Sequence, residues 1–107
     1  MAEKPRIKLP TSARKGEVIE IKTLISHPME PGYRADSNGA LMPRDIITDF
    51  ICKYNDDEIF RAELFPAIAA NPFFTFSTIA TESGTITFEW TGDNGFSATA
   101  SRNIAVE

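Results

Sequence analysis

The sequence predicts an all-β protein with an immunoglobulin-like antiparallel β-sandwich of about seven strands. Three observations lead to this fold class. Runs of alternating, β-branched and aromatic residues recur along the chain, turn-forming residues separate them at short spacing, and no segment has the period of a long helix. This pattern is typical of two packed antiparallel sheets. A length of 107 residues fits one such domain over residues 1–107.

The first two strands are expected at residues 6–9 and 17–25, with a turn at residues 11–16 between them. Pro5 and Pro10 bound the first run, which fits an edge strand because proline cannot donate to a β-ladder. In the second run, side chains two residues apart share a face. The face expected inside the sandwich carries Ile19, Ile21, Thr23 and Ile25.

Five further strands are expected after residue 44. Their ranges are 45–55, 58–65, 73–80, 85–91 and 96–106. Turn residues join the first two of them at Asn55-Asp56-Asp57 and the last two at residues 92–95. Between residues 66 and 72, prolines at both ends allow at most one helical turn. Trp90 points inward with Ile86 and Phe88, but the cysteine pair of antibody domains is absent, so the prediction is immunoglobulin-like only.

A long stretch without period, residues 26–44, separates the second and third expected strands. It holds three of the seven prolines and two of the six glycines, so its backbone is both stiffened and turned. A loop this long in a small domain is uncommon and often functional. An ordinary surface excursion is the alternative. The candidate docking residues in it are His27, Tyr33, Arg34, Asp36 and Arg44.

The arginines of this stretch have two interpretations. Arg34 and Arg44 could form a charged docking edge with Tyr33 and Asp36. The alternative is a local surface ion pair between Arg34 and Asp36. Two further interface candidates, Phe65 and Phe73, lie outside the stretch. They are candidates because the run at 73–80 is apolar on both faces, and a sandwich has only one interior in which to bury a face.

The composition excludes several function classes. A net charge of −4 argues against a nucleic-acid surface, and no apolar run is long enough to cross a membrane. One histidine and one cysteine are too few soft ligands for a zinc site, and no cofactor motif occurs. The N-terminus lacks the apolar core of a signal peptide, which by itself indicates the cytoplasm.

Cys52 decides between a binding module and an enzyme. It shares a strand face with Ile46, Thr48, Phe50 and Tyr54, so we expect it to be buried and inert. His27 precedes a proline at a strand end, where a hydrogen bond that orients the loop is expected. The sequence therefore favours a non-enzymatic module. The alternatives are an enzyme in which Cys52 and His27 form a nucleophile–base pair and a generic immunoglobulin-like interaction or adhesion module.

Several motifs carry a resemblance to a known family. They are Lys4 to Pro10, Ile25-Ser26-His27-Pro28-Met29-Glu30-Pro31-Gly32-Tyr33-Arg34, Asp36, Gly39, Leu41, Pro43-Arg44-Asp45-Ile46-Ile47, Leu64 to Phe73 and Thr85 to Trp90. Together they resemble the SoxZ subunit of the sulfur-oxidising Sox system, over nearly the whole chain.

The resemblance implies a function that the residues alone do not reach. SoxZ proteins are immunoglobulin-like sandwiches that form a heterodimer with SoxY, whose C-terminal Gly-Gly-Cys-Gly arm carries thiosulfate-derived intermediates between Sox enzymes. This sequence ends in Ala105-Val106-Glu107 without such an arm, so the resemblance implies the non-carrying subunit with no catalytic residue. It also implies the periplasm, reached by co-export with the partner, in place of the cytoplasm. The species that the family carries are anionic, and arginine suits oxyanions through its planar fork of donors, so the resemblance implies that Arg34 and Arg44 position the loaded SoxY arm or a client enzyme. The alternative that it raises is a sulfur-binding protein that uses the Cys52 thiol.

Overall fold

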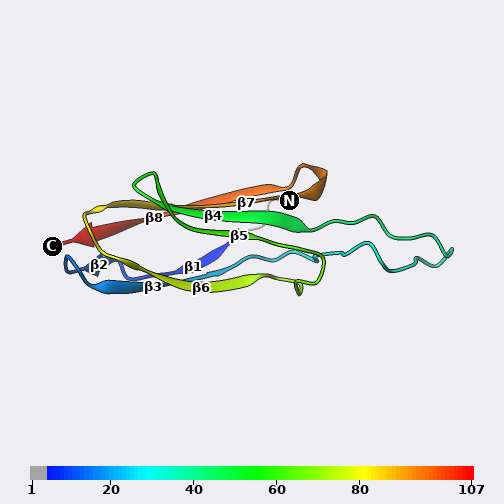
Figure 1. Cartoon of the computed structure of the whole chain (residues 1–107), viewed down its shortest axis with the longest axis horizontal. Coiled ribbons are helices and arrows are strands. Elements are labelled where there is room, and N and C mark those ends of the chain that lie inside the picture. Colours follow the sequence, from blue (N-terminus) through cyan, green and yellow to red (C-terminus); the bar gives the residue numbers. More distant parts are fainter. Residues whose placement is uncertain (1–4) are drawn as a thin grey trace.

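The structure, a computed structural model, describes residues 5–107 and is built from strands in two stacked sheets (Figure 1). Its principal extents are 60 × 23 × 19 Å, and a long arm at one end accounts for much of the length. The strands are β1 (Arg6–Lys8), β2 (Ser12–Ala13), β3 (Val18–Leu24), β4 (Ile47–Tyr54), β5 (Asp57–Glu63), β6 (Phe73–Ile79), β7 (Gly84–Gly92) and β8 (Ser97–Val106), with a 3₁₀ turn, η1 (Asp93–Gly95), between the last two.

The two sheets have the orders β1-β3-β6 and β2-β8-β7-β4-β5. All pairings are antiparallel except the short parallel contact between β2 and β8. The antiparallel β-sandwich predicted from the sequence is therefore confirmed. The edge strands are β1 and β6 in the smaller sheet, and β2 and β5 in the larger sheet.

The core lies between the facing sides of the sheets, where alternation buries every second residue. In β3 the buried residues are the predicted Ile19, Ile21 and Thr23, and Ile25 follows them. Phe50 in β4 is fully buried at the centre of an aromatic cluster. Its ring lies between 4.9 and 6.5 Å, centroid to centroid, from those of Phe60, Phe74, Phe76, Phe88 and Trp90.

Two details of the sequence-based prediction are wrong. Residues 11–16 were expected to form only a turn, but Ser12 and Ala13 form β2, so residues 5–107 contain eight strands. The predicted alternation of β4 also fails at its start, where Ile47 is buried and Thr48 is half-buried. The pairing of β4 with β7 shifts register between Ile47 and Asp49, and such a bulge reverses the side on which the next residues point.

Candidate functional site

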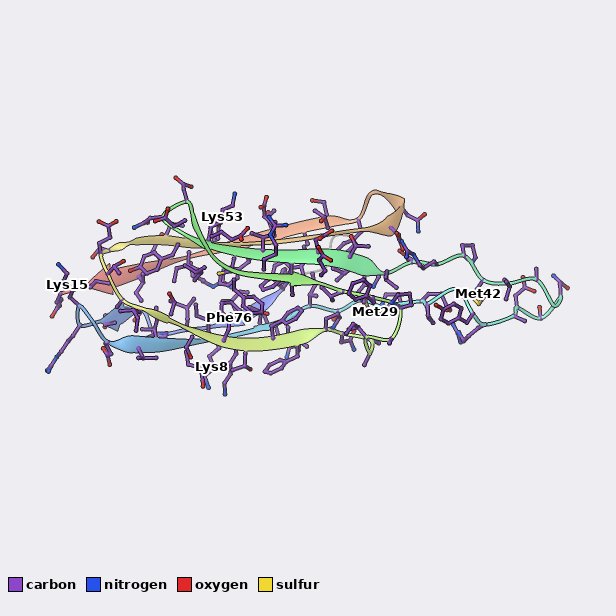
Figure 2. The ribbon with its side chains drawn as sticks, viewed as in Figure 1. Lys8, Lys15, Met29, Met42, Lys53 and Phe76 are labelled. Carbon is purple, nitrogen blue, oxygen red and sulfur yellow. The ribbon has the colours of Figure 1, made fainter. Side chains whose placement is uncertain are left out.

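The segment 26–44, here called the arm, projects from one end of the sandwich and carries no named strand or helix (Figure 1). Two isolated β-bridges, Glu30 with Asp45 and Ala35 with Leu41, hold its two limbs together as a long hairpin. The backbone N–H of Met42 also donates to the Arg34 carbonyl at 2.7 Å. The arm is thus an ordered ribbon with few of the ladder bonds of a sheet. Figure 2 shows Met29 where the arm leaves the body and Met42 further out.

The tip of the arm is closed by Asp36. One oxygen of its carboxylate accepts from the backbone N–H groups of Asn38 and Ala40, at 2.8 and 3.1 Å. Gly39 takes a φ of +81°, which glycine adopts without the strain of a Cβ atom. Asp36 therefore shapes the turn, and the ion pair between Arg34 and Asp36 that the sequence suggested does not form.

Arg34 pairs instead with Glu30 at the base of the arm. The Arg34 Nε donates to Glu30 Oε1 at 2.9 Å, and Nη2 contacts the same oxygen. The other oxygen of Glu30 accepts from the Gly32 N–H at 3.2 Å. The hydrogen bond from Arg34 holds the pKa of the Glu30 carboxyl below its usual value, against the opposing effect of desolvation. The nearly buried carboxylate of Glu30 thus links Gly32 and Arg34.

Arg44 ties the returning limb to the η1 turn. Its Nε and Nη2 donate to the two carboxylate oxygens of Asp93, both at 2.8 Å, in a fork that only arginine provides. Asp93 also accepts from the Ile46 N–H at 3.1 Å. The Arg44 hydrogen bond is the main cause of a lowered pKa at Asp93. The carboxylates of Glu30 and Asp93 already occupy Arg34 and Arg44, so the geometry does not favour these arginines as open anion sites.

His27 is buried at the base of the arm and makes the loop-orienting bond expected for it. Its Nδ1 accepts from the Met29 N–H at 2.9 Å, which assigns the ring proton of the neutral form to Nε2. Its backbone N–H donates to the Asn71 side chain at 2.9 Å, and its carbonyl accepts from the Asn71 N–H at 2.8 Å. The ring stands edge-on to Phe96, with 4.8 Å between centroids.

The Met29 thioether completes this base. Met29 is buried, takes a positive φ of 51°, and accepts from the Ile47 N–H at 3.2 Å. The residues that fix the arm and that the sequence did not reveal are Met29 and Glu30 within it, and Asn71 and Asp93 outside it. A Glu four residues before an Arg was a signal for one ion pair, whereas nothing local could indicate the contacts of Asn71 and Asp93 across the fold.

The other candidates fall at separate places. Tyr33 and Leu41 are exposed on the arm, at 76% and 69%, while Phe65 and Phe73 are exposed on and after the connection from β5 to β6. Cys52 is fully buried, as predicted. Among residues 5–107, no hydrogen bond joins Cys52 to His27, and no three His, Cys, Asp or Glu side chains gather to hold a metal. What the arm offers is a pre-shaped projecting surface, without a nucleophile–base pair.

The ion pairs of Glu30 with Arg34 and of Asp93 with Arg44 should break only in acid. A carboxyl whose pKa is lowered by folding stabilises the fold above its unfolded value and loses that contribution as pH falls through the folded value. In an NMR titration, the Gly32 and Ile46 amide shifts should report Glu30 and Asp93, because each amide donates to one of these carboxylates. The expected midpoints lie below the ordinary values of 4.5 and 3.8.

Each of the two ion pairs serves as the control for the other. The variant Arg34→Met should raise the Gly32 midpoint and leave that of Ile46 in place, and Arg44→Met should do the reverse. Midpoints at or above the ordinary values in the unmodified protein would contradict the two ion pairs.

Comparisons with known proteins agree with this architecture. A model of the family described as sulphur oxidation protein SoxZ matches residues 7–103. No curated protein sequence matches the chain. Within the described residues, no helix has the length and apolar character needed to cross a bilayer.

Several solved structures have similar folds, among them the following two. A superoxide reductase (neelaredoxin) from Ignicoccus hospitalis superposes with a TM-score of 0.73 at 18% identity, over 96% of this chain and 80% of that one. The sulfur carrier protein SoxY from Chlorobium limicola f thiosulfatophilum gives 0.67 at 13% identity, over 96% and 78%. At these identities the likeness concerns the fold alone.

Proposed function

The chain belongs to the SoxZ family, and from this premise we propose that it is the non-catalytic subunit of a SoxYZ sulfur-carrier heterodimer. In this role it binds and stabilises SoxY and helps to present the cysteine-bound, thiosulfate-derived intermediates of SoxY to the Sox enzymes. The family match over residues 7–103 carries the proposal, because it places the protein in sulfur oxidation.

Features of the chain support a binding role over a chemical one. Its single thiol is buried, its single histidine is engaged in the base of the arm, and seven large hydrophobic side chains in the described part are exposed. Exposed apolar side chains that gather on a surface often mark an interface. The arm, stiffened by its ties and carrying exposed Tyr33 and Leu41, is suited to contact Sox enzymes transiently. We place the complex in the periplasm, reached by co-export with SoxY.

The direct test is to co-express the chain with SoxY, purify by a tag on one subunit, and determine subunit masses. We expect a one-to-one heterodimer in which SoxY is more resistant to thermal unfolding than it is alone, because a partner that binds only the folded state stabilises it by mass action. The purified chain alone should not turn over thiosulfate. Failure of SoxY to co-purify, or turnover by the isolated chain, would overturn the proposal.

A further inference from the structure

The two outward faces of the sandwich differ in chemistry. On the smaller sheet, the outward residues of β3 and β6 include Val18, Phe73 and Ile79, exposed at 62%, 57% and 47%. We call the outward side of β1, β3 and β6 the apolar sheet face. Within residues 5–107, no large hydrophobic side chain of the five-stranded sheet is exposed in this way. The outward positions of that sheet include Thr87, Thr99 and Ser101.

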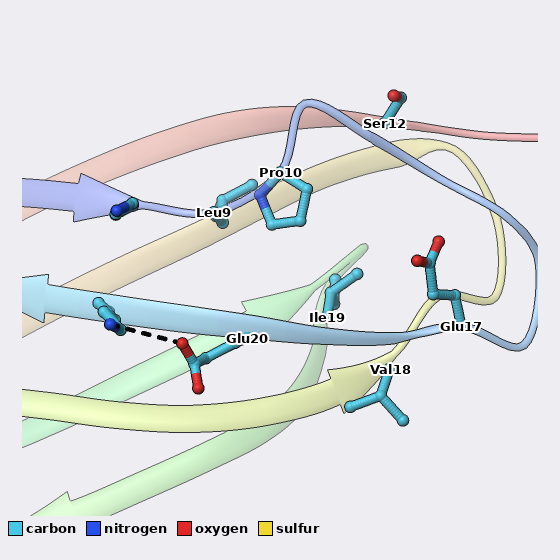
Figure 3. Close-up of a pocket in the computed structure, with 9 residues that line it drawn as sticks. Leu9, Pro10, Ser12, Glu17, Val18, Ile19 and Glu20 are labelled. Carbon is cyan, nitrogen blue, oxygen red and sulfur yellow. Dashed lines mark ion pairs between the residues drawn. The ribbon is translucent and has the colours of Figure 1, made fainter.

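The apolar residues stand at both ends of this face. Val18 pairs with Ile79 at the end far from the arm, and Leu24 pairs with Phe73 at the end near the base of the arm. A groove of about 380 Å³ opens beside the first pair, lined by Leu9, Pro10, Val18 and Glu20 among others (Figure 3). A second depression, of about 220 Å³, lies beside Leu24 and Phe73. The face is thus long, apolar at both ends and hollowed along its β1 side.

The middle of the apolar sheet face is basic. Lys8 and Lys22 point outward there with one carboxylate, Glu20, which lies 3.5 Å from the Lys22 amine. Arg6 points outward beside Leu24, at the end near the base of the arm. Three cations against one anion contrast with a whole chain whose net charge is −4. A partner that complements this face therefore needs apolar contacts at two ends and carboxylates between them.

We propose that the apolar sheet face is the surface on which SoxY docks, by sheet-on-sheet packing against an apolar SoxY face that carries carboxylates. This inference rests on the proposed function and adds the surface and the partner chemistry. The fold likeness to SoxY supports this packing mode, because two β-sandwiches can stack open sheets about 10 Å apart. A second copy of this chain fits less well, since a two-fold contact would set the cations of Lys8 and Lys22 against their own copies.

Lysine protection tests the surface in the unmodified complex. Figure 2 shows Lys8 and Lys53 on opposite sides of the sandwich and Lys15 at the end away from the arm. Acetylation of the free chain and of the SoxY complex, followed by mass spectrometry, should show Lys8 and Lys22 protected by SoxY. Lys15 and Lys53 should keep their reactivity.

Matched substitutions test it by affinity. Phe73→Asp adds a charge to the apolar sheet face, and Thr99→Asp adds the same charge to the opposite sheet; both positions are exposed. We expect Phe73→Asp to weaken SoxY binding at least about 30-fold, the loss typical of an interface hot spot, and Thr99→Asp to leave it within about twofold. Thermal unfolding of both variants checks that the fold persists, and the protection experiment decides if Phe73→Asp does not fold.

The outcomes separate this inference from the function on which it rests. If SoxY binds but protects Lys53 rather than Lys8 and Lys22, or binds Phe73→Asp with unchanged affinity, the docking surface is elsewhere and the heterodimer stands. If the unmodified chain does not bind SoxY at all, the proposed function itself fails.

Discussion

Replacing Phe50 with alanine is expected to lower the free energy of unfolding by about 3–5 kcal/mol, the usual cost of emptying a buried phenylalanine site. Phe50 is fully buried and its ring lies 4.9 Å from that of Phe74, nearly parallel to it, and 5.0 Å from that of Trp90. It is the side chain that joins the aromatic residues of β6 in one sheet to those of β7 in the other. The loss is large against a typical total of about 5–15 kcal/mol.

The measurement is thermal or urea unfolding followed by circular dichroism, with Phe73→Ala as the matched control. Phe73 is also a strand phenylalanine, but it is more than half exposed, so its truncation should change stability by no more than about 0.5 kcal/mol. For a domain of this size, the loss at Phe50 corresponds to a melting temperature lower by at least about 12 °C. Equal effects at the two positions would show that the aromatic core is not where the structure places it.

Period-two alternation explains why so much of the fold could be predicted. In β3 and β7 the predicted inward residues are the buried ones, and the pairings of β3 with β6 and of β7 with β8 keep a regular register. Alternation fails where register changes, and the bulge after Ile47 depends on pairing with β7, which lies about forty residues away. The two residues of β2 form a strand only because β8 passes beside them, and no local pattern announces this.

The arm could be located from its prolines and glycines, but its contacts could not. Turn chemistry at Asp36 and Gly39 is local, so a turn there was predictable. The ion pair of Arg44 with Asp93 spans 49 positions and depends on how the sheets stack. Charge alone made Arg34 and Arg44 candidates for binding anions, and only the fold shows that carboxylates of the chain already occupy them.

Cys52 is expected to react with thiol reagents at least about a thousandfold more slowly in the folded protein than in denaturant. Burial raises the pKa of the Cys52 thiol from an ordinary 9.0 to about 12, because the thiolate loses its hydration. Three pH units remove about a factor of 10³ from the reactive thiolate fraction at any pH well below 9. The complete inaccessibility of the side chain slows the reaction further.

This result would distinguish the proposed non-carrying subunit from a protein that binds sulfur through its own thiol. A sulfur-binding thiol must reach its substrate as a thiolate, which requires exposure and a low pKa. The measurement is labelling by an aromatic disulfide reagent at pH 8, native and in denaturant, followed by absorbance. The accessible control is a variant with a cysteine on the outward face of the five-stranded sheet, Thr99→Cys in a Cys52→Ala background. In the structure, Cys52 pairs with Phe60 and Phe88 of the neighbouring strands, inside the core. Native labelling of Cys52 at the rate of that control would show that the thiol is accessible after all, and would support the thiol-using alternative.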